Sequence, residues 1–256
     1  MDITWNYTQY AAAYSKRPDY CRQAIEQMLN IANLPENAEV CDIGAGAAHL
    51  TLMLAEHNYS VLAIEPNAEM RQIGIDRSKS FDNIRWKEGI AEETGQPNKS
   101  FDFVTFGSSF NVCDSRRALI ETHRILKPGR YFACMWNHRN LEDPIQSNIE
   151  NIIKKNLPSY QYGSRRESPE QLIKSSNLYN DIIRIEGDVV HKQSIDDCIE
   201  AWYSHATLGN QAGPSFKLIL SEIEAYLRQL KTDYIQVPYT TRIWLAKSKD
   251  KKQEDM

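Results

Sequence analysis

A glycine turn between a short apolar segment and a helical segment constrains this chain more than any other feature. Residues 40–55 read VCDIGAGAAHLTLMLA, an apolar run that reaches Asp42, continues into Gly44-Ala45-Gly46 and opens a helix. Glycine at positions 44 and 46 lets a ligand approach the backbone where any Cβ atom would collide. The helix that follows begins with N–H groups that can bind the polar parts of a ligand. The segment therefore predicts a strand–turn–helix unit with a ligand at its turn.

A carboxylate at the end of the next apolar segment narrows the class of ligand. Residues 61–70 read VLAIEPNAEM, and Glu65 stands 23 residues after Asp42. A carboxylate at the tip of the second strand can accept two charge-assisted hydrogen bonds from a ribose diol. A dinucleotide fingerprint needs a third glycine, but position 49 is His49. Asp42, just before the turn, suits a ligand amine better than a pyrophosphate. We therefore expect a nucleoside-bearing cofactor that is not a dinucleotide.

The following residues continue the alternation of strand and helix. RWKEGI (85–90) predicts a third strand, and the Phe/Val-rich run from Ser100 predicts a buried fourth strand. Pro128 and Gly129 end the helix that contains ALIETHRIL and turn the chain into the apolar strand YFACMW. Strands that alternate with helices over residues 38–136 predict an α/β fold built on a parallel sheet.

These motifs resemble a known family. An acidic residue, two glycines and a second acidic residue that ends the next strand are similar to the class I S-adenosylmethionine-dependent methyltransferases. The segments at 100–136 and the closing VPYTTRIWLAKS resemble the fourth, fifth and last strands of that family, so the likeness covers nearly the whole chain. The resemblance implies a Rossmann-like, seven-stranded mixed sheet with strand order 3-2-1-4-5-7-6 and helices on both faces.

The N-terminal segment and the residues after the predicted fifth strand resemble a subgroup of this family. The leader TWNYTQYAAAYSKRPDY and Trp136-Asn137-His138-Arg139 resemble small-molecule methyltransferases related to the trans-aconitate and ubiquinone/menaquinone biosynthesis enzymes. This chain departs from the family at Ala48, where a third glycine is common, and at Phe110-Asn111-Val112, where Phe-His-Trp is frequent. Asn111 replaces a histidine that would have been a base in the substrate pocket.

The resemblance implies S-adenosyl-L-methionine as the cofactor and assigns its contacts. The first loop faces the methionine part, the acid of the second strand holds the ribose, the loop after the third strand contacts adenine, and the end of the fourth strand lies beside the sulfonium. The residues so assigned are Asp42, Gly44, Ala45, Gly46, Glu65, Pro66, Met70, Gly89, Ile90, Ala91, Gly107 and Ser108. Tyr14, from the leader, is expected to cover the cofactor.

The acceptor site is predicted from position alone. His138 follows the fifth strand at the ligand edge and is our candidate general base, with His205 as a second candidate, and Tyr14 can point its hydroxyl at the acceptor. A carboxylate acceptor would need no base. His49 is expected to pack at the start of its helix. Further residues expected to bind the acceptor are Tyr10, Arg17, Ser109, Asn111 and Asn137, and Arg116, Arg117 and Arg139 either bind an anionic acceptor or are solvated.

Three functions remain open: a small-molecule methyltransferase, a methyltransferase acting on RNA or protein, and a non-catalytic protein that binds the cofactor. A net charge of −4 gives no electrostatic footprint for nucleic acid. The residues GSSFNVCD stand where an Asn/Asp-Pro-Pro-Tyr signature would indicate amino-group chemistry on bases. We therefore expect a small-molecule substrate and no nucleic-acid partner.

Segment composition bears on compartment and domains. We expect no membrane span and no signal peptide, because no apolar run is long enough. The five cysteines show neither the CxxC spacing of a zinc site nor a disulfide framework, so we expect a cytoplasmic protein. No metal is expected. We predict one domain over residues 1–256, with a helical leader at 1–37 and a helical lid insertion at 137–180. Helices are expected near 195–206 and 216–230, and the second of these is expected to use its apolar residues for core packing. The oligomeric state stays open.

Overall fold

A seven-stranded mixed sheet forms the centre of the computed structural model, which describes residues 14, 16–162, 167–203 and 205–249. The strands are β1 (Glu39–Ile43), β2 (Ser60–Ile64), β3 (Ile84–Lys87), β4 (Phe101–Gly107), β5 (Leu126–Arg139), β6 (Tyr179–Ser194) and β7 (Tyr234–Ser248). Their order is β3-β2-β1-β4-β5-β7-β6, with β7 antiparallel to both neighbours and the other pairs parallel. The predicted fold class and strand order are confirmed.

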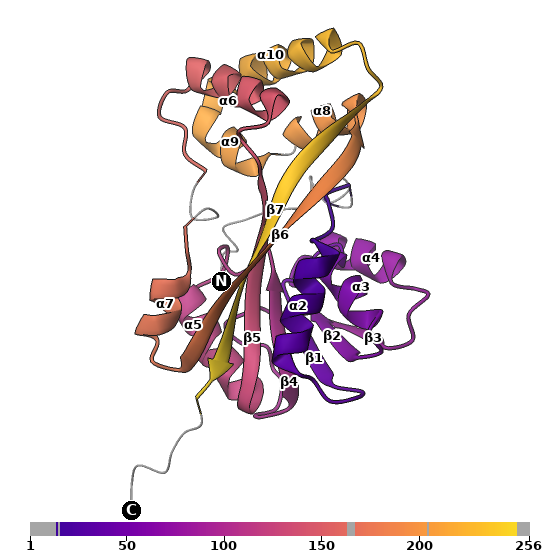
Figure 1. Cartoon of the computed structure of the whole chain (residues 1–256), viewed down its shortest axis with the longest axis vertical. Helices are drawn as coiled ribbons and strands as arrows, with labels where there is room; N and C mark the ends of the chain where they lie inside the picture. The colour runs from indigo at the N-terminus through magenta and orange to yellow at the C-terminus, as the bar shows by residue number, and fades with distance from the viewer. Residues whose placement is uncertain (1–13, 15, 163–166, 204, 250–256) are drawn as a thin grey trace, which may run out of the picture.

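Helices cover both faces of the sheet and one end of it (Figure 1). They are α2 (Arg22–Ala32), α3 (His49–Ala55), α4 (Ala68–Arg77), α5 (Ser115–Ile125), α6 (Pro144–Asn156), α7 (Glu170–Ser175), α8 (Ile195–Tyr203), α9 (Ala206–Ala212) and α10 (Phe216–Gln229). Side-chain caps fix several starts: Asp114 accepts from the first N–H groups of α5, Asp143 from those of α6, and Asn67 from that of Met70 in α4. Such caps satisfy N–H groups that have no partner within the helix.

Alternating side chains of the strands build two hydrophobic cores, because successive residues of a strand point to opposite faces. Phe103 of β4 faces the layer of α2 and α3, together with Val40 and Val61. Val104 and Phe106 face the opposite layer, which contains α5 and α7. The burial of every residue from Phe101 to Phe106 explains why this strand reads as a continuous apolar run in the sequence.

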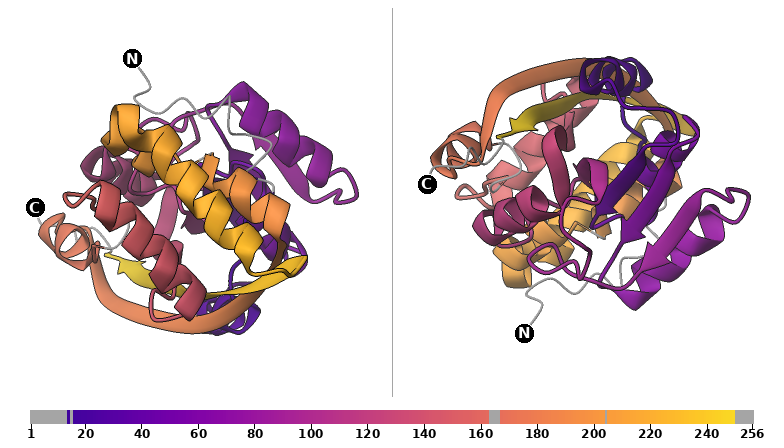
Figure 2. Two further views of the ribbon diagram at one scale, coloured as in Figure 1. Left: turned by 90° about the horizontal axis from the view of Figure 1, so that it is seen from above. Right: turned by 90° about the horizontal axis from the view of Figure 1, so that it is seen from below.

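A third helical layer, here called the cap, closes the upper end of the molecule. It comprises residues 140–162 and 195–233 and contains α6, α8, α9 and α10. The long strands β6 and β7 rise beyond the rest of the sheet and reach it (Figure 1), and the view from above shows its helices lying across the end of the sheet (Figure 2). The cap has a hydrophobic cluster of its own, which includes Ile149, Ile199 and Ile223.

The lid expected over residues 137–180 is corrected in extent. Residues 137–139 belong to β5, and β6 begins at Tyr179. Helix α7 lies beside α5, where Ile173 joins the core of the sheet, so it does not cover the carboxyl ends of the strands. Helices α8 and α10 form the other part of the cap, and α10 buries its apolar residues in a hydrophobic cluster, as expected from its sequence. Only α6 of the predicted insertion takes the predicted place.

Two further boundaries differ from the sequence prediction. The leader helix begins at Arg22 rather than near Pro18, and residues 16–21, here called the strap, lie before it outside any helix or strand. The third strand ends at Lys87, before Gly89 and Ile90. In the part of the chain that the structure describes, every helix is too short or too polar to cross a lipid bilayer.

Candidate active site

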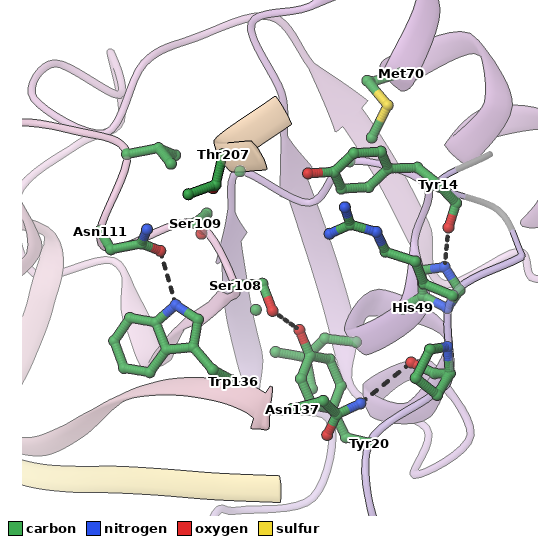
Figure 3. A pocket seen from close by; sticks show the side chains of 18 of the residues that line it. Tyr14, Tyr20, His49, Met70, Ser108, Ser109, Asn111, Trp136, Asn137 and Thr207 are labelled. Carbon is green, nitrogen blue, oxygen red and sulfur yellow. Dashed lines mark hydrogen bonds between the residues drawn. The ribbon is translucent and has the colours of Figure 1, made fainter. Parts of the chain in front are cut away.

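A cavity of about 790 Å³ lies at the carboxyl ends of β1, β2, β4 and β5, between the sheet and the cap. Its walls come from the glycine loop at 44–47, the strap near residues 16–20, the ends of β4 and β5, and the cap helices α6 and α8. Figure 3 shows the part of this cavity around Tyr14, Ser108 and Asn111. The volume falls within the range of small-molecule sites, which is about 300–1,000 Å³.

The glycine loop has a backbone that favours glycine. Gly44 and Gly46 have φ angles of 68° and 54°, and a Cβ atom on Gly44 would lie 2.4 Å from Cβ of Ser109. The N–H groups of Gly44 and Ala45 donate to the carbonyl oxygen of Ile64, at 2.8 and 3.1 Å, and so fix the loop to β2. Ala48 also has a positive φ angle, 68°, so the alanine keeps the left-handed turn at a cost of about 1 kcal/mol.

Glu65 is held at the tip of β2 by two backbone groups. Its Oε2 accepts from the N–H of Gly46 and its Oε1 from the N–H of Asn67, both at 2.9 Å. The side chain is buried, and this burial raises the pKa of its carboxyl group. Each oxygen of an ionised carboxylate has a further lone pair, so Glu65 can accept hydroxyl hydrogens from a ligand while it keeps the loop in place.

Asp42 lies beneath the same loop and is fully buried. Its Oδ2 accepts from Thr51 Oγ1 at 2.6 Å and its Oδ1 from Thr105 Oγ1 at 2.9 Å. Burial raises the pKa of Asp42 to about 6, although both threonine bonds act against this shift. The carboxyl group thus ties β1 to α3 and β4, and it also lines the cavity.

Ser108 and Tyr20 meet at the end of β4. The two hydroxyl oxygens are 2.9 Å apart, and the backbone of Ser108 has a φ angle of 60° (Figure 3). Burial raises the pKa of the Tyr20 hydroxyl far above its ordinary range, so this group stays protonated. A Cβ atom on Gly107 would lie 3.0 Å from that hydroxyl oxygen, which leaves no room for a side chain there. Tyr20 is a site residue that the sequence analysis missed.

The strap is attached to the sheet by His49. Its Nε2 donates to the carbonyl oxygen of Tyr14 at 2.9 Å, and its Nδ1 lies 2.6 Å from Asp19 Oδ1. A carbonyl oxygen only accepts hydrogen bonds, so Nε2 is the donor in the contact with Tyr14. The hydrogen bond from His49 lowers the pKa of Asp19. His49 therefore fastens the strap, which agrees with a role at the start of α3.

Tyr14 and Arg17 lie next to each other on the cavity wall. The guanidinium carbon of Arg17 is 3.5 Å from the centroid of the Tyr14 ring, and the ring packs near Met70 and Ala47. The amide of Asn137 donates to the carbonyl oxygens of Pro18 and Asp19, at 3.2 and 3.0 Å. These contacts give Asn137 a part in holding the strap, besides its place in the cavity wall.

The two candidate bases differ in what they can do. His138 is buried in β5 and lines the cavity. His205 also lines it, but its Nδ1 accepts from the N–H of Leu208 at 3.2 Å and caps α9. In a neutral imidazole the proton must then be on Nε2, so His205 presents a donor to the cavity. The geometry therefore favours His138 over His205 as a proton acceptor.

Most of the other predicted residues also line the cavity, and two of them are fixed by contacts of their own. Ser109 Oγ donates to the carbonyl oxygen of Ile43 at 2.5 Å, and Asn111 Oδ1 accepts from Trp136 Nε1 at 2.7 Å. The remaining predicted residues in the wall are Pro66, Ile90, Ala91, Arg117 and Arg139.

Some predicted residues lie elsewhere. Gly89 is not in the wall: a Cβ atom there would lie 3.0 Å from Cγ2 of Ile64, so it packs against β2. Arg116 is not in the wall either, although Arg117 beside it is. Tyr10 falls outside the described residues. The sequence analysis did not name the residues on the cap side of the cavity, because they come from α6, a loop, α8 and β7, which lie far apart in the sequence; they are Gln146, Glu150, Tyr162, Trp202 and Tyr239.

Comparison with known proteins agrees with this geometry. The family model of a methyltransferase domain matches residues 41–134, which contain the glycine loop, Glu65 and Ser108. The structure of a putative type II methyltransferase from Anaeromyxobacter dehalogenans shares the fold, with a TM-score of 0.63 and 19% identity over 91% of this chain and 97% of that one. Residues 41–134 therefore carry a methyltransferase domain, and the fold agrees with that of the class I S-adenosylmethionine-dependent methyltransferases, whose cofactor is S-adenosyl-L-methionine.

Curated relatives match over part of their length. An uncharacterized methyltransferase of Schizosaccharomyces pombe is 28% identical over 149 residues, which are 58% of this chain and 58% of the relative. Demethylmenaquinone methyltransferase of Staphylococcus epidermidis is 31% identical over 114 residues, which are 43% of this chain and 47% of that protein. The matches thus span about half of the relatives' length.

Proposed function

We propose that the protein transfers a methyl group from S-adenosyl-L-methionine to a small-molecule acceptor. One observation carries the proposal: a single cavity of about 790 Å³ joins the glycine loop and Glu65 to the cap-side wall formed by α6 and α8. A methyl donor and an acceptor can therefore share one enclosed space, as direct transfer between two bound molecules requires. The relative from Staphylococcus epidermidis, whose name specifies a small-molecule substrate, supports the same class of acceptor.

The residues around the glycine loop fit this cofactor. The loop brings backbone to the cavity without side chains at Gly44 and Gly46, and an added Cβ at Gly46 would lie 3.1 Å from Cε of Met70. The carboxylate of Glu65 keeps lone pairs for a ribose diol. Ile90 and Ala91 lie in the same wall and offer apolar contact to a base. These residues would hold the nucleoside and methionine parts.

The protein's own tasks in such a reaction are alignment, exclusion of water and, for some acceptors, removal of a proton. When bound, the cofactor supplies a methyl group on a sulfonium centre. The strap and the cap cover the cavity, and the Ser108–Tyr20 pair fixes the end of β4 at its wall. His138 lies at the end of β5 on the same cavity and takes the proton from an acceptor group that must lose one.

Two other functions are weighed against this one. A methyltransferase acting on RNA or protein would need a way to bring a macromolecular side group into the cavity, and the net charge of −4 does not favour RNA. A protein that binds the cofactor without catalysis would share the same loop and the same Glu65, since fold alone does not fix function. A cavity with room for a second small molecule beside the glycine loop favours a small acceptor over a macromolecule, and the transfer assay below separates catalysis from binding alone.

The test uses the purified chain, S-adenosylmethionine with a labelled methyl group, and three fractions of a cell extract: low-mass metabolites, RNA and protein. We expect label to enter the low-mass fraction, and S-adenosylmethionine and S-adenosylhomocysteine, but not NAD, to bind in calorimetry. Label in RNA or protein would support the second function. Binding of the cofactor without transfer into any fraction would support the third.

A substitution at His138 shows whether the acceptor must lose a proton before it is methylated. If the acceptor must lose a proton to His138, His138→Ala should lower turnover by about 10²–10⁴-fold, with cofactor affinity unchanged. If the acceptor is already an anion at the reacting atom, the same variant should keep most of its activity, also at acidic pH. His57→Ala is the matched control, because His57 lies outside the cavity wall, beside Glu26.

We also propose that the protein works in the cytoplasm. All five cysteines are free in the structure, and four of them are buried. Free thiols are typical of a reducing compartment. Fractionation of cells that express the chain with a small tag would test this, and recovery in a membrane or secreted fraction would contradict it.

A further inference from the structure

The cap side of the cavity holds an arginine in a fixed position. Arg139, the last residue of β5, has its guanidinium carbon 4.3 Å from the centroid of the Trp202 ring in α8. Its Nε donates to the hydroxyl oxygen of Tyr239 in β7 at 3.1 Å. All three residues line the cavity. A guanidinium held over an indole keeps its charge and its orientation, so a ligand meets a preorganised cation.

Other hydrogen-bond donors lie in the same wall. Gln146, in the first turn of α6, is 3% exposed, and its Nε2 has no hydrogen-bond partner among the described residues. His205 stacks on the same Trp202 ring, with 5.1 Å between centroids, and carries its proton on Nε2. Buried polar atoms are normally satisfied, so an amide N–H without a partner in a cavity wall indicates a ligand that accepts.

Among the described residues, Glu150 is the carboxylate on the cap side of the cavity wall, and it has a hydrogen bond and an ion pair within the cap. Glu150 is buried in α6, accepts from the hydroxyl of Tyr162, and forms an ion pair with Lys154 at 2.9 Å. Its charge is thereby matched within the cap. The other lysine and arginine residues of the described cavity wall, Lys16, Arg17 and Arg117, belong to the strap and to α5. Among the described residues of the cap-side wall, Arg139 is the one whose side chain carries a positive charge.

We infer that the acceptor is a small organic carboxylate whose carboxylate group binds Arg139, with Gln146 and His205 as further donors; this rests on the proposed methyl transfer to a small molecule. One cation suits a carboxylate, which has one negative charge, better than a phosphate monoester, which has nearly two. The two oxygens of a carboxylate also match the two parallel N–H groups of a guanidinium.

The experiment begins with the labelled-methyl assay on a low-mass cell extract, divided on an anion exchanger into retained and unretained molecules. Half of the retained fraction is treated with phosphatase. We expect label transfer with the retained fraction, before and after phosphatase. Activity only with the unretained fraction, or loss of activity after phosphatase, would overturn the inference and leave the methyl transfer standing. Activity with neither fraction would remove the proposed function itself.

Variants then test the residue. Arg139→Gln should raise the KM for the retained fraction at least tenfold, while the affinity for S-adenosylhomocysteine in calorimetry stays within twofold. Arg139→Lys keeps the charge and should recover part of the loss. The matched control is Arg184→Gln, because Arg184 lies over Trp244 at 5.8 Å in β6, outside the cavity wall.

The melting temperature of each variant guards against a folding defect. If Arg139→Gln alone is unstable, the KM of Arg139→Lys, measured against that of the parent, decides the matter. An unchanged KM in Arg139→Gln, or an equal rise in Arg184→Gln, would show that Arg139 does not bind the acceptor.

Discussion

Glu65→Ala is the substitution whose effect the structure defines most fully. The carboxylate accepts the N–H groups of Gly46 and Asn67 and has lone pairs left for a ribose diol. Loss of a hydrogen bond to a charged group costs about 1.5–3 kcal/mol. The affinity for S-adenosylhomocysteine should therefore fall roughly 10- to 150-fold. The free protein should also become less stable by about 1–3 kcal/mol, because two N–H groups lose their acceptor.

Two assays separate these effects. Isothermal titration calorimetry with S-adenosylhomocysteine measures affinity at a temperature where both proteins are folded, and urea unfolding without ligand measures stability. Glu88→Ala is the control, since Glu88 follows β3 directly and has a 74% exposed side chain that pairs with Arg71. Affinity within twofold of the parent in Glu65→Ala, or an equal loss in Glu88→Ala, would refute the assignment of Glu65 to the ribose.

Three further outcomes follow from contacts in and below the glycine loop. Gly44→Ala should destabilise the protein by about 1–3 kcal/mol in urea unfolding, because the new Cβ would lie 2.4 Å from Cβ of Ser109. Gly95→Ala is the control: Gly95 has a φ angle of 64°, but the atom nearest to its added Cβ would lie 3.5 Å away, so this variant should lose less stability. Equal losses in the two variants would contradict the steric argument. Asp42 has a pKa raised from 3.8 to about 6, so its protonated form stabilises the fold below pH 4, and this contribution is lost as the pH rises through about 6. Between about pH 4 and pH 6, the free energy of unfolding of the parent should fall by up to about 3 kcal/mol relative to that of Asp42→Asn. If the two proteins show parallel curves of unfolding free energy against pH, the effect of burial on Asp42 is refuted. Tyr20→Phe should cost about 1 kcal/mol through the lost bond to Ser108, and no change in unfolding would show that this bond is not formed in solution.

The sheet could be predicted because its signals are local. The glycine loop, the acid at the end of β2 and the Pro128-Gly129 turn each lie within a few residues of the element that they define. Burial on both faces also leaves β4 as a continuous apolar run that can be recognised. The strand order came from resemblance to a family, since pairing of β1 with β4 joins residues about sixty positions apart.

The acceptor side could not be predicted in the same way. The cap joins residues 140–162, which follow β5, with residues 195–233, which lie between the long strands β6 and β7. The contact of Tyr20 with Ser108 spans 88 positions, and no periodic pattern in the sequence specifies it. Asn137 was assigned to the acceptor from its place after a strand, whereas its amide also binds the strap.

The separate hydrophobic cluster of the cap has a consequence for how molecules enter and leave. The side chains of Ile149, Ile199 and Ile223 pack with one another rather than with the two cores of the sheet. Regions that have their own core can open as units while the rest of a protein stays folded. Amide hydrogens of α6, α8 and α10 should then exchange together, at a lower free energy than those of β1 and β4. Substitutions within this cluster would thus change how often the cap opens, and with it how fast acceptor and product enter and leave the cavity. The strands that hold the nucleoside would stay unaltered.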